Sequence, residues 1–388
     1  MNPTTKKRKI CVLSLNRSEY SRIRSVIRAI QERDDLELSM VVLNSKFANN
    51  KILLEKDGFP IHHVVNITID ERSPYKTAKA IGEVTDKFAA VFYTEKPDIL
   101  LVLGDRYEAL GAVIAASFQN MYIAHIQGGE VTGTLDEHTR HAITKLAHFH
   151  FPSTAASAER VIKLGEYKEH VMHVGCPGTD SLLEAPELTF EELRYELYKL
   201  AGNRREILER LTPGYLLALQ FPVATEVDDA GRQITETLNA LKQFPDRTKV
   251  FLTPTPDAGG DVVEAALRAY AETDPKAIVL KHVPSHLFVN LMRHSAVMLG
   301  NSSAGIRETG YFGLPTLNIG SRQTGRERSS NIVDVPHEEG AIAAALGEQL
   351  SQGRYPIEQM YGTGGTGKLI AEALATIDIS KIQKRLAY

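Results

Sequence analysis

Short apolar runs alternate with amphipathic stretches along almost the whole chain. Runs such as 10–15 (ICVLSL) and 99–103 (ILLVL) show no regular alternation of polar and apolar residues, and a segment with helical spacing follows each of them. Strands of this kind are typical of a parallel sheet that is covered on both faces. The pattern therefore predicts strand–helix units with right-handed crossovers, which is a doubly wound α/β fold.

The length of 388 residues predicts two domains, because single domains usually run to about 100–200 residues. Residues 179–213 are rich in Glu, Arg, Leu and Tyr and lack the strand pattern, so we predict a connection there. We predict one Rossmann-like domain over 1–178 and a second over 214–365, with a final helix that could pack on either. Two such domains would hold a ligand in an interdomain cleft at the carboxyl ends of their strands.

The amino-acid composition limits which kinds of binding partner and which cellular compartment we expect. The formal net charge of −3 argues against nucleic acid or an anionic membrane as the main partner. Cys11 and Cys176 each stand in an apolar run, which predicts buried thiols and no disulfide framework. We see no signal peptide and no apolar run long enough to span a bilayer, so we expect a cytoplasmic protein.

Two polar clusters follow predicted strands in the first half. Arg17, Ser18 and Ser21 stand beside a predicted helix N-terminus, which suits a phosphate, although Ser18 could simply cap the helix. The first strand lacks the G-x-G-x-x-G fingerprint of dinucleotide binding. Asp105 and Arg106 come directly after the run 99–103 and could form a structural ion pair or bind a substrate.

The densest cluster is HIQGGEVTGTLDEHTRH over 125–141. Its two adjacent glycines would let the backbone approach a ligand. Carboxylates that converge near a cleft are typical of proton-transfer chemistry. Along the predicted helix, Asp136 and Arg140 share a face, as do Glu137 and His141. Within this run no H-x-x-x-H or H-E-x-x-H pattern occurs, and we predict no metal site.

A fourth cluster, GNSSAGIRE over 300–308, combines two serines with a predicted helix start after a strand. Ser302 and Ser303 would cradle a phosphate there, and Glu308 would accept hydrogen bonds from ribose hydroxyls. Arg322 and Arg326 add positive charge nearby.

In this order, the four clusters resemble the hydrolysing UDP-N-acetylglucosamine 2-epimerases, which include sialic-acid and nonulosonic-acid pathway enzymes of bacteria. The most specific stretches are GDRYEAL, HIQGGEVTGTLDEHTRHAITKLAH, KHVPSHLF and GNSSAGIRETGYFGLPTLNIGSRQTGRE. The resemblance implies the GT-B architecture, with a C-terminal helix within 366–388 joining the first domain. It also implies a homodimer and a reaction that needs neither metal nor NAD, so no cofactor is expected.

The family reaction converts UDP-N-acetylglucosamine to N-acetylmannosamine and UDP by elimination to a 2-acetamidoglucal, which is then hydrated. By resemblance, the catalytic side chains would be Asp105, Asp136 and, near the sugar, Glu130 and Gln127. The residues that hold UDP would be Arg17, Ser18, Ser21, Arg106, Val283, Ser302, Ser303, Glu308 and Arg322.

Three positions depart from the family pattern. Gln127 stands where many members have Glu, and an amide cannot act as a general acid or base. Phe221 replaces a phosphate-contacting histidine, and Thr255 stands where Asn is common. These departures put the nucleotide and sugar preference in doubt rather than the fold.

Three other functions remain open. The same chemistry could act on a UDP-2,4-diacetamido-trideoxyhexose or on a GDP-linked amino sugar. A GT-B glycosyltransferase would share the fold but would need an acceptor. A catalytically silent sugar-nucleotide-binding protein would bind UDP without turnover.

Overall fold

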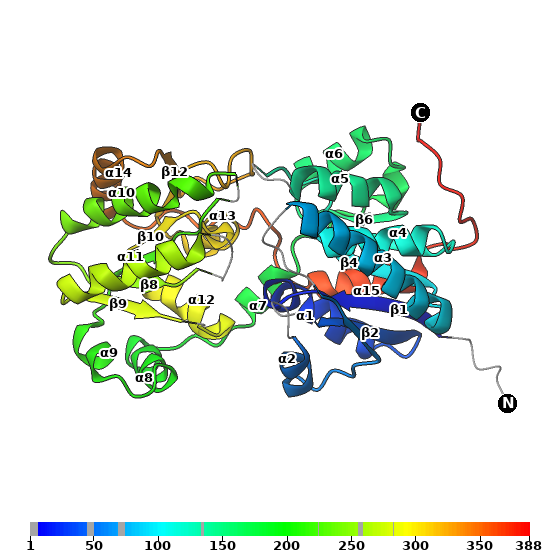
Figure 1. Ribbon diagram of the computed structural model, residues 1–388, viewed down its shortest axis with the longest axis horizontal. Helices are drawn as coiled ribbons and strands as arrows, with labels where there is room; N and C mark the ends of the chain where they lie inside the picture. Colours follow the sequence, from blue (N-terminus) through cyan, green and yellow to red (C-terminus); the bar gives the residue numbers. More distant parts are fainter. Residues whose placement is uncertain are drawn as a thin grey trace. The chain divides into compact units, whose positions relative to one another are not determined.

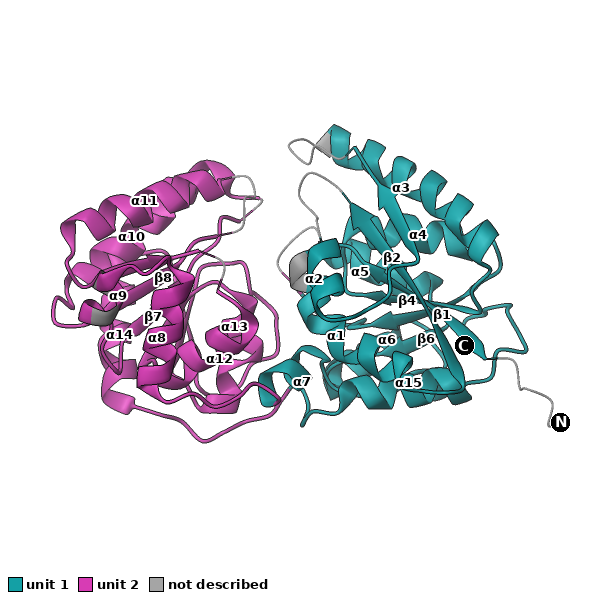
Figure 2. Cartoon of the chain, turned by 90° about the horizontal axis from the view of Figure 1, so that it is seen from below, with its two compact units in different colours: residues 1–131, 135–183, 361–388 teal, residues 132–134, 184–360 magenta. Residues whose placement is uncertain are grey.

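The computed structural model describes residues 7–44, 50–68, 74–132, 136–223, 225–254, 259–281 and 283–388, without the side chains of Arg17, Ser18, Pro74, Glu206 and Leu208. It divides into two compact units (Figure 2). Unit 1 comprises 1–131, 135–183 and 361–388, and unit 2 comprises 132–134 and 184–360. The predicted Thr255 departure lies outside the described residues.

Within the described residues, unit 1 contains one six-stranded parallel sheet in the order β3-β2-β1-β4-β5-β6. Its strands are β1 (Arg8–Ser14), β2 (Leu36–Asn44), β3 (His63–Asn66), β4 (Ile99–Leu103), β5 (Tyr122–Ile126) and β6 (Phe149–Phe151). Its helices are α1 (Arg17–Gln31), α2 (Lys51–Lys56), α3 (Pro74–Glu95), α4 (Tyr107–Ser117), α5 (Asp136–Leu146), α6 (Ala155–Lys163), α7 (Gly178–Leu183) and α15 (Thr366–Thr376), with a short 3-10 helix η1 (Lys168–His170).

Apolar residues cover both faces of this sheet, as the unbroken strands predicted. Side chains of α1 and α15 form one core with alternate residues of the strands. Helices α3, α4 and α5, which Figure 1 labels, belong to the opposite face, and their side chains form a second core there. Both cysteines are free and buried, which confirms the sequence prediction.

Unit 2 repeats the same plan, with a parallel sheet in the order β12-β11-β10-β7-β8-β9 among its described residues. Its strands are β7 (Leu216–Leu219), β8 (Lys249–Leu252), β9 (Ala277–Leu280), β10 (Val297–Gly300), β11 (Thr316–Ile319) and β12 (Ile332–Val335). Its helices are α8 (Phe190–Leu200), α9 (Arg205–Arg210), α10 (Ala230–Lys242), α11 (Gly260–Thr273), α12 (Ser285–His294), α13 (Ser303–Arg307) and α14 (Glu339–Gln352), with 3-10 helices η2 (Val227–Asp229) and η3 (Thr309–Phe312).

Both sheets have the strand order of the Rossmann fold. In this fold the chain adds strands toward one edge of the sheet, then returns to the middle and adds strands toward the other edge. The point at which it returns to the middle lies between β1 and β4 in unit 1 and between β7 and β10 in unit 2. Ligands of doubly wound folds bind outside the strand ends at this position. The predicted clusters after β1, β4 and β10 therefore lie at the switch points of their own sheets.

The boundary between the units differs from the expected one. The predicted connection 179–213 contains α7 in unit 1, whereas α8 and α9 belong to unit 2, where they pack against α12 and β9. Residues 170–174, which precede the predicted connection, make one isolated bridge, between Val171 and His150. Amphipathic helices with an apolar stripe must bury it, and the nearest apolar surface decides the unit they join.

The C-terminal helix α15 packs on α1 in unit 1. Both carboxylate oxygens of Asp180 accept hydrogen bonds from its first turn, from the amides of Thr366 at 3.0 Å and Gly367 at 2.8 Å. A Cβ at Gly367 would lie 2.6 Å from the backbone of Ser25 in α1, so only glycine permits this close approach. Asp180 thus caps a helix that is 186 residues away in the sequence.

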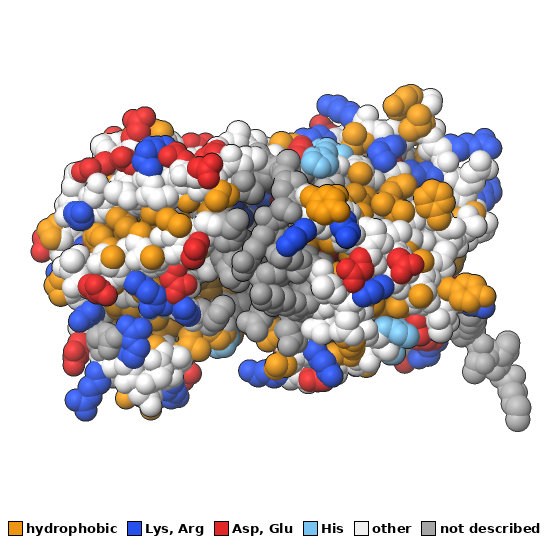
Figure 3. Space-filling model, viewed as in Figure 1, with side chains coloured by type: hydrophobic (Ala, Val, Ile, Leu, Met, Phe, Trp, Pro, Cys, Tyr) orange, Lys and Arg blue, Asp and Glu red, His pale blue; other side chains and the backbone are white. Residues whose placement is uncertain are grey.

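Charges of both signs are interspersed on the face shown in Figure 3, in each unit. Among the described residues, the model contains no helix long and apolar enough to cross a membrane.

Gly300 generates a test of the unit 2 fold. Its φ is +122°, and an added Cβ would lie 1.9 Å from the carbonyl oxygen of Leu219 on the neighbouring strand. We expect Gly300→Ala to lower the free energy of unfolding by about 2–4 kcal/mol, because both the backbone angle and the contact must change. Chemical denaturation followed by circular dichroism measures the change.

Gly347→Ala is the matched control in the same unit. Gly347 lies inside α14, and an added Cβ would meet no heavy atom within 4 Å. We expect this variant to gain about 0.4–1 kcal/mol from helix propensity. An equal loss in both variants would contradict the steric explanation for Gly300.

Candidate active site

The first cluster begins where β1 ends and α1 starts. Asn16 caps α1, and its side-chain oxygen accepts the amide hydrogen of Glu19 at 2.9 Å. The cap is therefore Asn16, and the alternative in which Ser18 caps the helix is wrong, because α1 already begins at Arg17. Ser21 lies half-buried in the same helix. The side chains of Arg17 and Ser18 are outside the description.

Glu19, which was not singled out from the sequence, is buried beside this cap. Its Oε2 accepts the amide hydrogen of Leu15 at 3.2 Å, while Oε1 has no hydrogen-bond partner among the residues that the structure describes. Burial, together with a smaller contribution from the neighbouring carboxylate of Glu108, raises the pKa of Glu19 to about 8. A buried carboxyl group that keeps its proton near neutral pH thus lies at the switch point of the unit 1 sheet.

The second cluster lies against the first. Arg106 donates two hydrogen bonds to Glu108, at 3.0 Å from Nε and 2.7 Å from Nη2, and its guanidinium lies over the ring of Tyr107. The charges of Arg106, Glu108 and Asp105 all act on Glu19. The structure therefore brings together two clusters that lie about 90 residues apart in the sequence.

Arg140 of α5 is the centre of the third cluster. Its side chain is 1% exposed, and its guanidinium contacts three acceptors from three segments. It donates to the carbonyl oxygen of Glu130 and to Glu137 Oε2, both at 2.9 Å, and it forms an ion pair with Asp105. Charge-assisted bonds of this kind are strong, and a buried guanidinium without them would be very costly.

Glu137 completes this arrangement and was not among the predicted catalytic residues. Its other oxygen, Oε1, lies 2.9 Å from Nε2 of His141, which confirms the pairing that the four-residue spacing predicted. Asp136, the predicted catalytic residue, is exposed at the first position of α5. Glu137 could have been found from its i, i+3 spacing to Arg140.

The two glycines in the turn after β5 lie close to other residues of unit 1. A Cβ at Gly129 would lie 2.2 Å from the carbonyl oxygen of Ser157, and one at Gly128 would lie 3.0 Å from His125 and Thr144. These glycines therefore allow α5 and α6 to approach the turn, and the approach of a ligand to them stays a prediction. Glu130, directly after them, is 6% exposed.

Gln127 and His125 both face the interior. The Gln127 side chain donates from Nε2 to Sγ of Cys176 at 3.0 Å, and its backbone has a φ of +66°. Nε2 of His125 lies 2.7 Å from the carbonyl oxygen of Gly104, and Nδ1 lies 3.1 Å from the hydroxyl of Thr144. Burial lowers the pKa of His125 to about 3, so its ring is neutral and joins the ends of β4 and β5.

Asn301, buried at the switch point of unit 2, organises the fourth cluster. Its side chain accepts from the amide of Phe221 at 2.7 Å and donates to the carbonyl of Phe221 at 2.8 Å. Its own carbonyl oxygen accepts from Arg322 Nη1 at 3.0 Å and from Gln323 Nε2 at 2.8 Å. Three chain segments therefore meet immediately before the two serines.

Ser302 caps α13, and its hydroxyl oxygen accepts the amide hydrogen of Ala304 at 3.3 Å. Ser303 is the first residue of that helix, and Glu308 follows its last. Val283 lies half-buried in the loop between β9 and α12. Ser302, Ser303, Glu308, Val283 and Arg322 therefore all come from unit 2, whereas the other predicted site residues come from unit 1.

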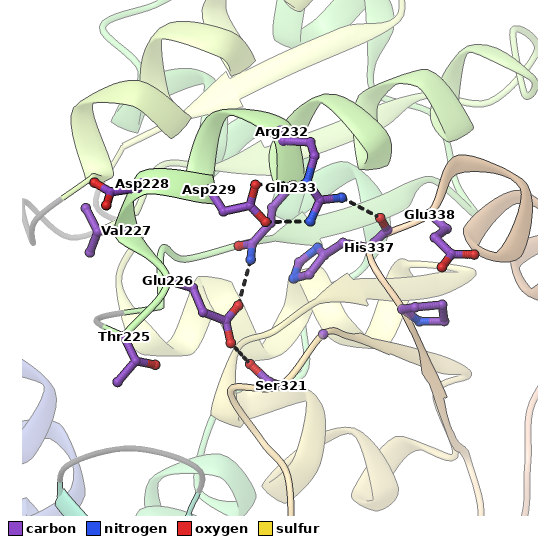
Figure 4. A pocket seen from close by; sticks show the side chains of 12 residues that line it. Thr225, Glu226, Val227, Asp228, Asp229, Arg232, Gln233, Ser321, His337 and Glu338 are labelled. Atoms are coloured by element: carbon purple, nitrogen blue, oxygen red, sulfur yellow. Dashed lines mark hydrogen bonds and ion pairs between the residues drawn. The ribbon is translucent and has the colours of Figure 1, made fainter.

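A pocket of about 500 Å³ lies beside this cluster, at the loops that follow β11 and β12. Figure 4 shows Glu226 at its wall, accepting from Gln233 at 2.7 Å and contacting Ser321. Its lining includes one cation, Arg232, which pairs with Asp229, and the carboxylates Glu226, Asp228, Asp229 and Glu338. This excess of negative charge suits neither phosphate nor diphosphate.

Among the described residues, the model contains no group of three or more His, Cys, Asp or Glu side chains arranged to hold a metal ion. Groups that could take part in chemistry lie in the polar cluster of Asp105, Glu137 and Arg140 and at the hydroxyl-rich start of α13. Unit 1 offers carboxylates for proton transfer, and unit 2 offers hydroxyls, amides and Arg322 for an anion.

Comparisons with known proteins show the family to which the chain belongs. The family model for UDP-N-acetylglucosamine 2-epimerase matches residues 28–375. A UDP-N,N'-diacetylbacillosamine 2-epimerase (hydrolyzing) from Legionella pneumophila is 34% identical over 376 residues, which cover 96% of this chain and 97% of the relative. The polysialic acid biosynthesis protein P7 of Escherichia coli is 30% identical over 87% of this chain and 85% of its own length.

The fold also matches solved structures. A crystal structure of UDP-GlcNAc 2-epimerase from Neisseria meningitidis superposes with a TM-score of 0.79 at 18% identity, covering 94% of this chain and 99% of that one. The architecture is thus the GT-B fold of two Rossmann-like domains. The chain belongs to the UDP-N-acetylglucosamine 2-epimerase family, and it is a 2-epimerase of nucleotide-linked amino sugars.

Glu19 generates a pH prediction for unit 1. Its pKa is about 8 in the folded chain and about 4.5 when exposed, so the folded state binds one more proton between these values. Stability must then fall as pH rises from about 4.5 to 8, by up to tenfold in the folding equilibrium constant per pH unit. Glu19→Gln, which is neutral throughout, should lose less stability than the parent between pH 5 and pH 8.

Urea denaturation of both proteins at pH 5 and pH 8 measures this difference. Glu32→Gln is the control, because Glu32 is exposed at the end of α1. A Glu19→Gln variant whose pH dependence equals that of the parent would mean that Glu19 is ionised in the folded chain.

Proposed function

We propose that the protein is a hydrolysing 2-epimerase whose substrate is a UDP-2,4-diacetamido-trideoxyhexose. The observation that carries the proposal is the Asp105–Arg140–Glu137 cluster at the ends of β4 and β5, where carboxylates from separate segments converge. The name of the Legionella relative, which matches nearly the full length of both chains, supports the sugar class. The loss of UDP and the release of a free sugar are part of the same proposal.

The reaction has two steps. In the first, a carboxylate removes the proton on C2 of the sugar while the C1–oxygen bond breaks, so UDP departs and a 2-acetamidoglucal forms. In the second, water adds its hydroxyl to C1, and a proton returns to C2 from the opposite face. The products are UDP and a free sugar with inverted configuration at C2.

The C2 proton is only weakly acidic, so the reaction rate must depend largely on how well the departing diphosphate is stabilised. Negative charge grows on the diphosphate as it departs, and positioned cations and N–H donors lower the energy of that state. We assign this role to Arg322, Ser302 and Ser303, with Arg17, Ser18, Ser21 and Arg106 contributing from unit 1. Val283 and Glu308 would contact the base and the ribose.

Unit 1 supplies the proton-transfer groups in this proposal. Asp105 and Asp136 serve as the catalytic carboxylates, and Glu130, whose carbonyl oxygen also accepts from Arg140, supplies a third. Arg140 holds Asp105 in place through a buried ion pair, which supports a fixed geometry for the reacting group. Gln127 then has a positioning role against Cys176, since an amide transfers no proton at neutral pH.

UDP-N-acetylglucosamine is the second candidate substrate. The Neisseria enzyme that shares the fold was crystallised with this sugar nucleotide.

A homodimer in the cytoplasm belongs to the same proposal, and the exposed aromatic side chains Tyr75 and Tyr93 on α3 offer apolar surface for a second copy. Light scattering on the purified protein would distinguish the dimer from a monomer.

Proton NMR in D2O tests the reaction itself. With the UDP-diacetamido sugar, we expect a free sugar that carries deuterium at C2, together with an equal amount of UDP. Deuterium enters because the proton on C2 is exchanged with solvent during elimination and hydration.

The same experiment is repeated with the other candidate substrates. Turnover only with UDP-N-acetylglucosamine, or only with a GDP-linked amino sugar, would replace the proposed substrate. Reversible epimerisation without release of sugar would indicate a non-hydrolysing enzyme, and transfer to an added acceptor would indicate a glycosyltransferase. Binding of UDP with no turnover of any of them would make the protein a silent binding protein.

Asp105→Asn and Asp136→Asn test the catalytic roles. We expect each to lower kcat by about 10²–10⁴-fold, because a general acid or base is lost. UDP affinity should stay within a few-fold of the parent, because the main phosphate contacts are in unit 2. Stopped assays give kcat, and isothermal titration gives the affinity.

Asp86→Asn serves as the control, since Asp86 is an exposed residue of α3 in the same unit. Parent-like turnover in either active-site variant would remove that residue from the catalytic assignment.

A further inference from the structure

Phe221 and Arg322 form a contact that the proposed function does not by itself explain. The guanidinium carbon of Arg322 lies over the Phe221 ring, 5.1 Å from its centroid. The two residues come from different loops, one after β7 and one after β11, at the carboxyl edge of the unit 2 sheet. A cation over an aromatic face at this distance is attracted to the electron-rich ring.

The backbone of Phe221 is fixed at both of its polar atoms. The side-chain amide of Asn301 accepts from its N–H at 2.7 Å and donates to its carbonyl at 2.8 Å. Asn301 is fully buried and is itself bonded to the carbonyl of Leu219 at 3.0 Å. The ring of Phe221 is therefore presented from a rigid support.

The same asparagine also holds the other partner. Its carbonyl oxygen accepts from Nη1 of Arg322 at 3.0 Å, so the guanidinium is held at one edge by this bond and on one face by the ring. A ring contacts a guanidinium through its face and uses none of its five N–H donors. A carboxylate partner would instead use two donors and cancel the charge.

This support ends directly at the hydroxyl-bearing start of α13. Asn301 is followed by Ser302, whose hydroxyl caps α13, and by Ser303 at its first position. Arg322 is therefore bonded to the residue that precedes the serines assigned to the diphosphate. The arrangement fixes the orientation of the Arg322 guanidinium beside the residue that leads into this hydroxyl-bearing segment.

We propose that Phe221 is a positioning residue that holds the Arg322 guanidinium ready for the diphosphate of the sugar nucleotide. The inference rests on the proposed function, because it needs a nucleoside diphosphate as the ligand. Phe221 acts through Arg322, so its effect is confined to the phosphates and does not extend to the nucleoside. Fixing the side chain before binding reduces the rotational freedom lost when the ligand arrives.

Isothermal titration with UDP and with uridine tests the proposal. Phe221→Leu removes the aromatic face but keeps an apolar side chain, and it should weaken UDP binding about three- to tenfold. Uridine, which has no phosphate, should bind the variant and the parent equally. Phe221→Tyr keeps the ring and should restore parent-like affinity for UDP.

A double-mutant cycle separates positioning from a general effect on the fold. In an Arg322→Ala background, Phe221→Leu should cause no further loss of UDP affinity, because the guanidinium that it positions is gone. Full additivity of the two losses, or an equal loss for UDP and uridine, would overturn the proposal. The urea midpoint of each variant shows whether folding is preserved.

The outcome also separates this inference from the function on which it rests. If the unaltered protein does not bind UDP, the proposed function fails and the inference fails with it. If UDP binds and turnover occurs but Phe221→Leu binds UDP like the parent, only the inference is overturned.

Discussion

The buried guanidinium of Arg140 is the interaction on which the organisation of unit 1 depends. A fully charged group that is 1% exposed must have its donors satisfied, since an unpaired buried charge costs several kcal/mol. Its acceptors are Asp105 after β4, the carbonyl of Glu130 after β5, and Glu137 on α5. These three segments therefore hold one geometry, and two of the proposed catalytic residues belong to them.

In unit 2, a neutral side chain joins the segments around the candidate site. Asn301 joins the loops after β7 and β11 to the end of β10 through hydrogen bonds that need no charge. Arg322 is held by one of these bonds beside the start of α13. Ser321, which precedes Arg322 in the chain, lines the acidic pocket around Glu226, so the local charge changes between two neighbouring residues.

Much of the fold could be predicted, because buried strands are recognisable in the sequence as continuous apolar runs. The runs that became β4, β5 and β10 are apolar throughout, and the structure buries them completely. The short strands β3 and β12 are not recognisable in the sequence, because each lies at a sheet edge and carries exposed or half-exposed residues that interrupt the apolar run. The boundary at 184 was also missed, since α8 and α9 reveal their unit only through the surfaces on which they pack.

For the candidate site, the sequence alone determined the segments that matter, because strand ends in a doubly wound fold must lie at one edge of a sheet. It also determined the chemical character of each segment: carboxylates with Arg140 in the first half, and serines with Arg322 in the second. Only the tertiary structure decided which side chains meet. Glu19 gained its raised pKa from burial beside Glu108, Gln127 turned toward Cys176, and Phe221 came to lie against Arg322. These contacts join residues that are far apart in the chain, and a pattern of neighbours along a sequence carries no information on distances across a folded core.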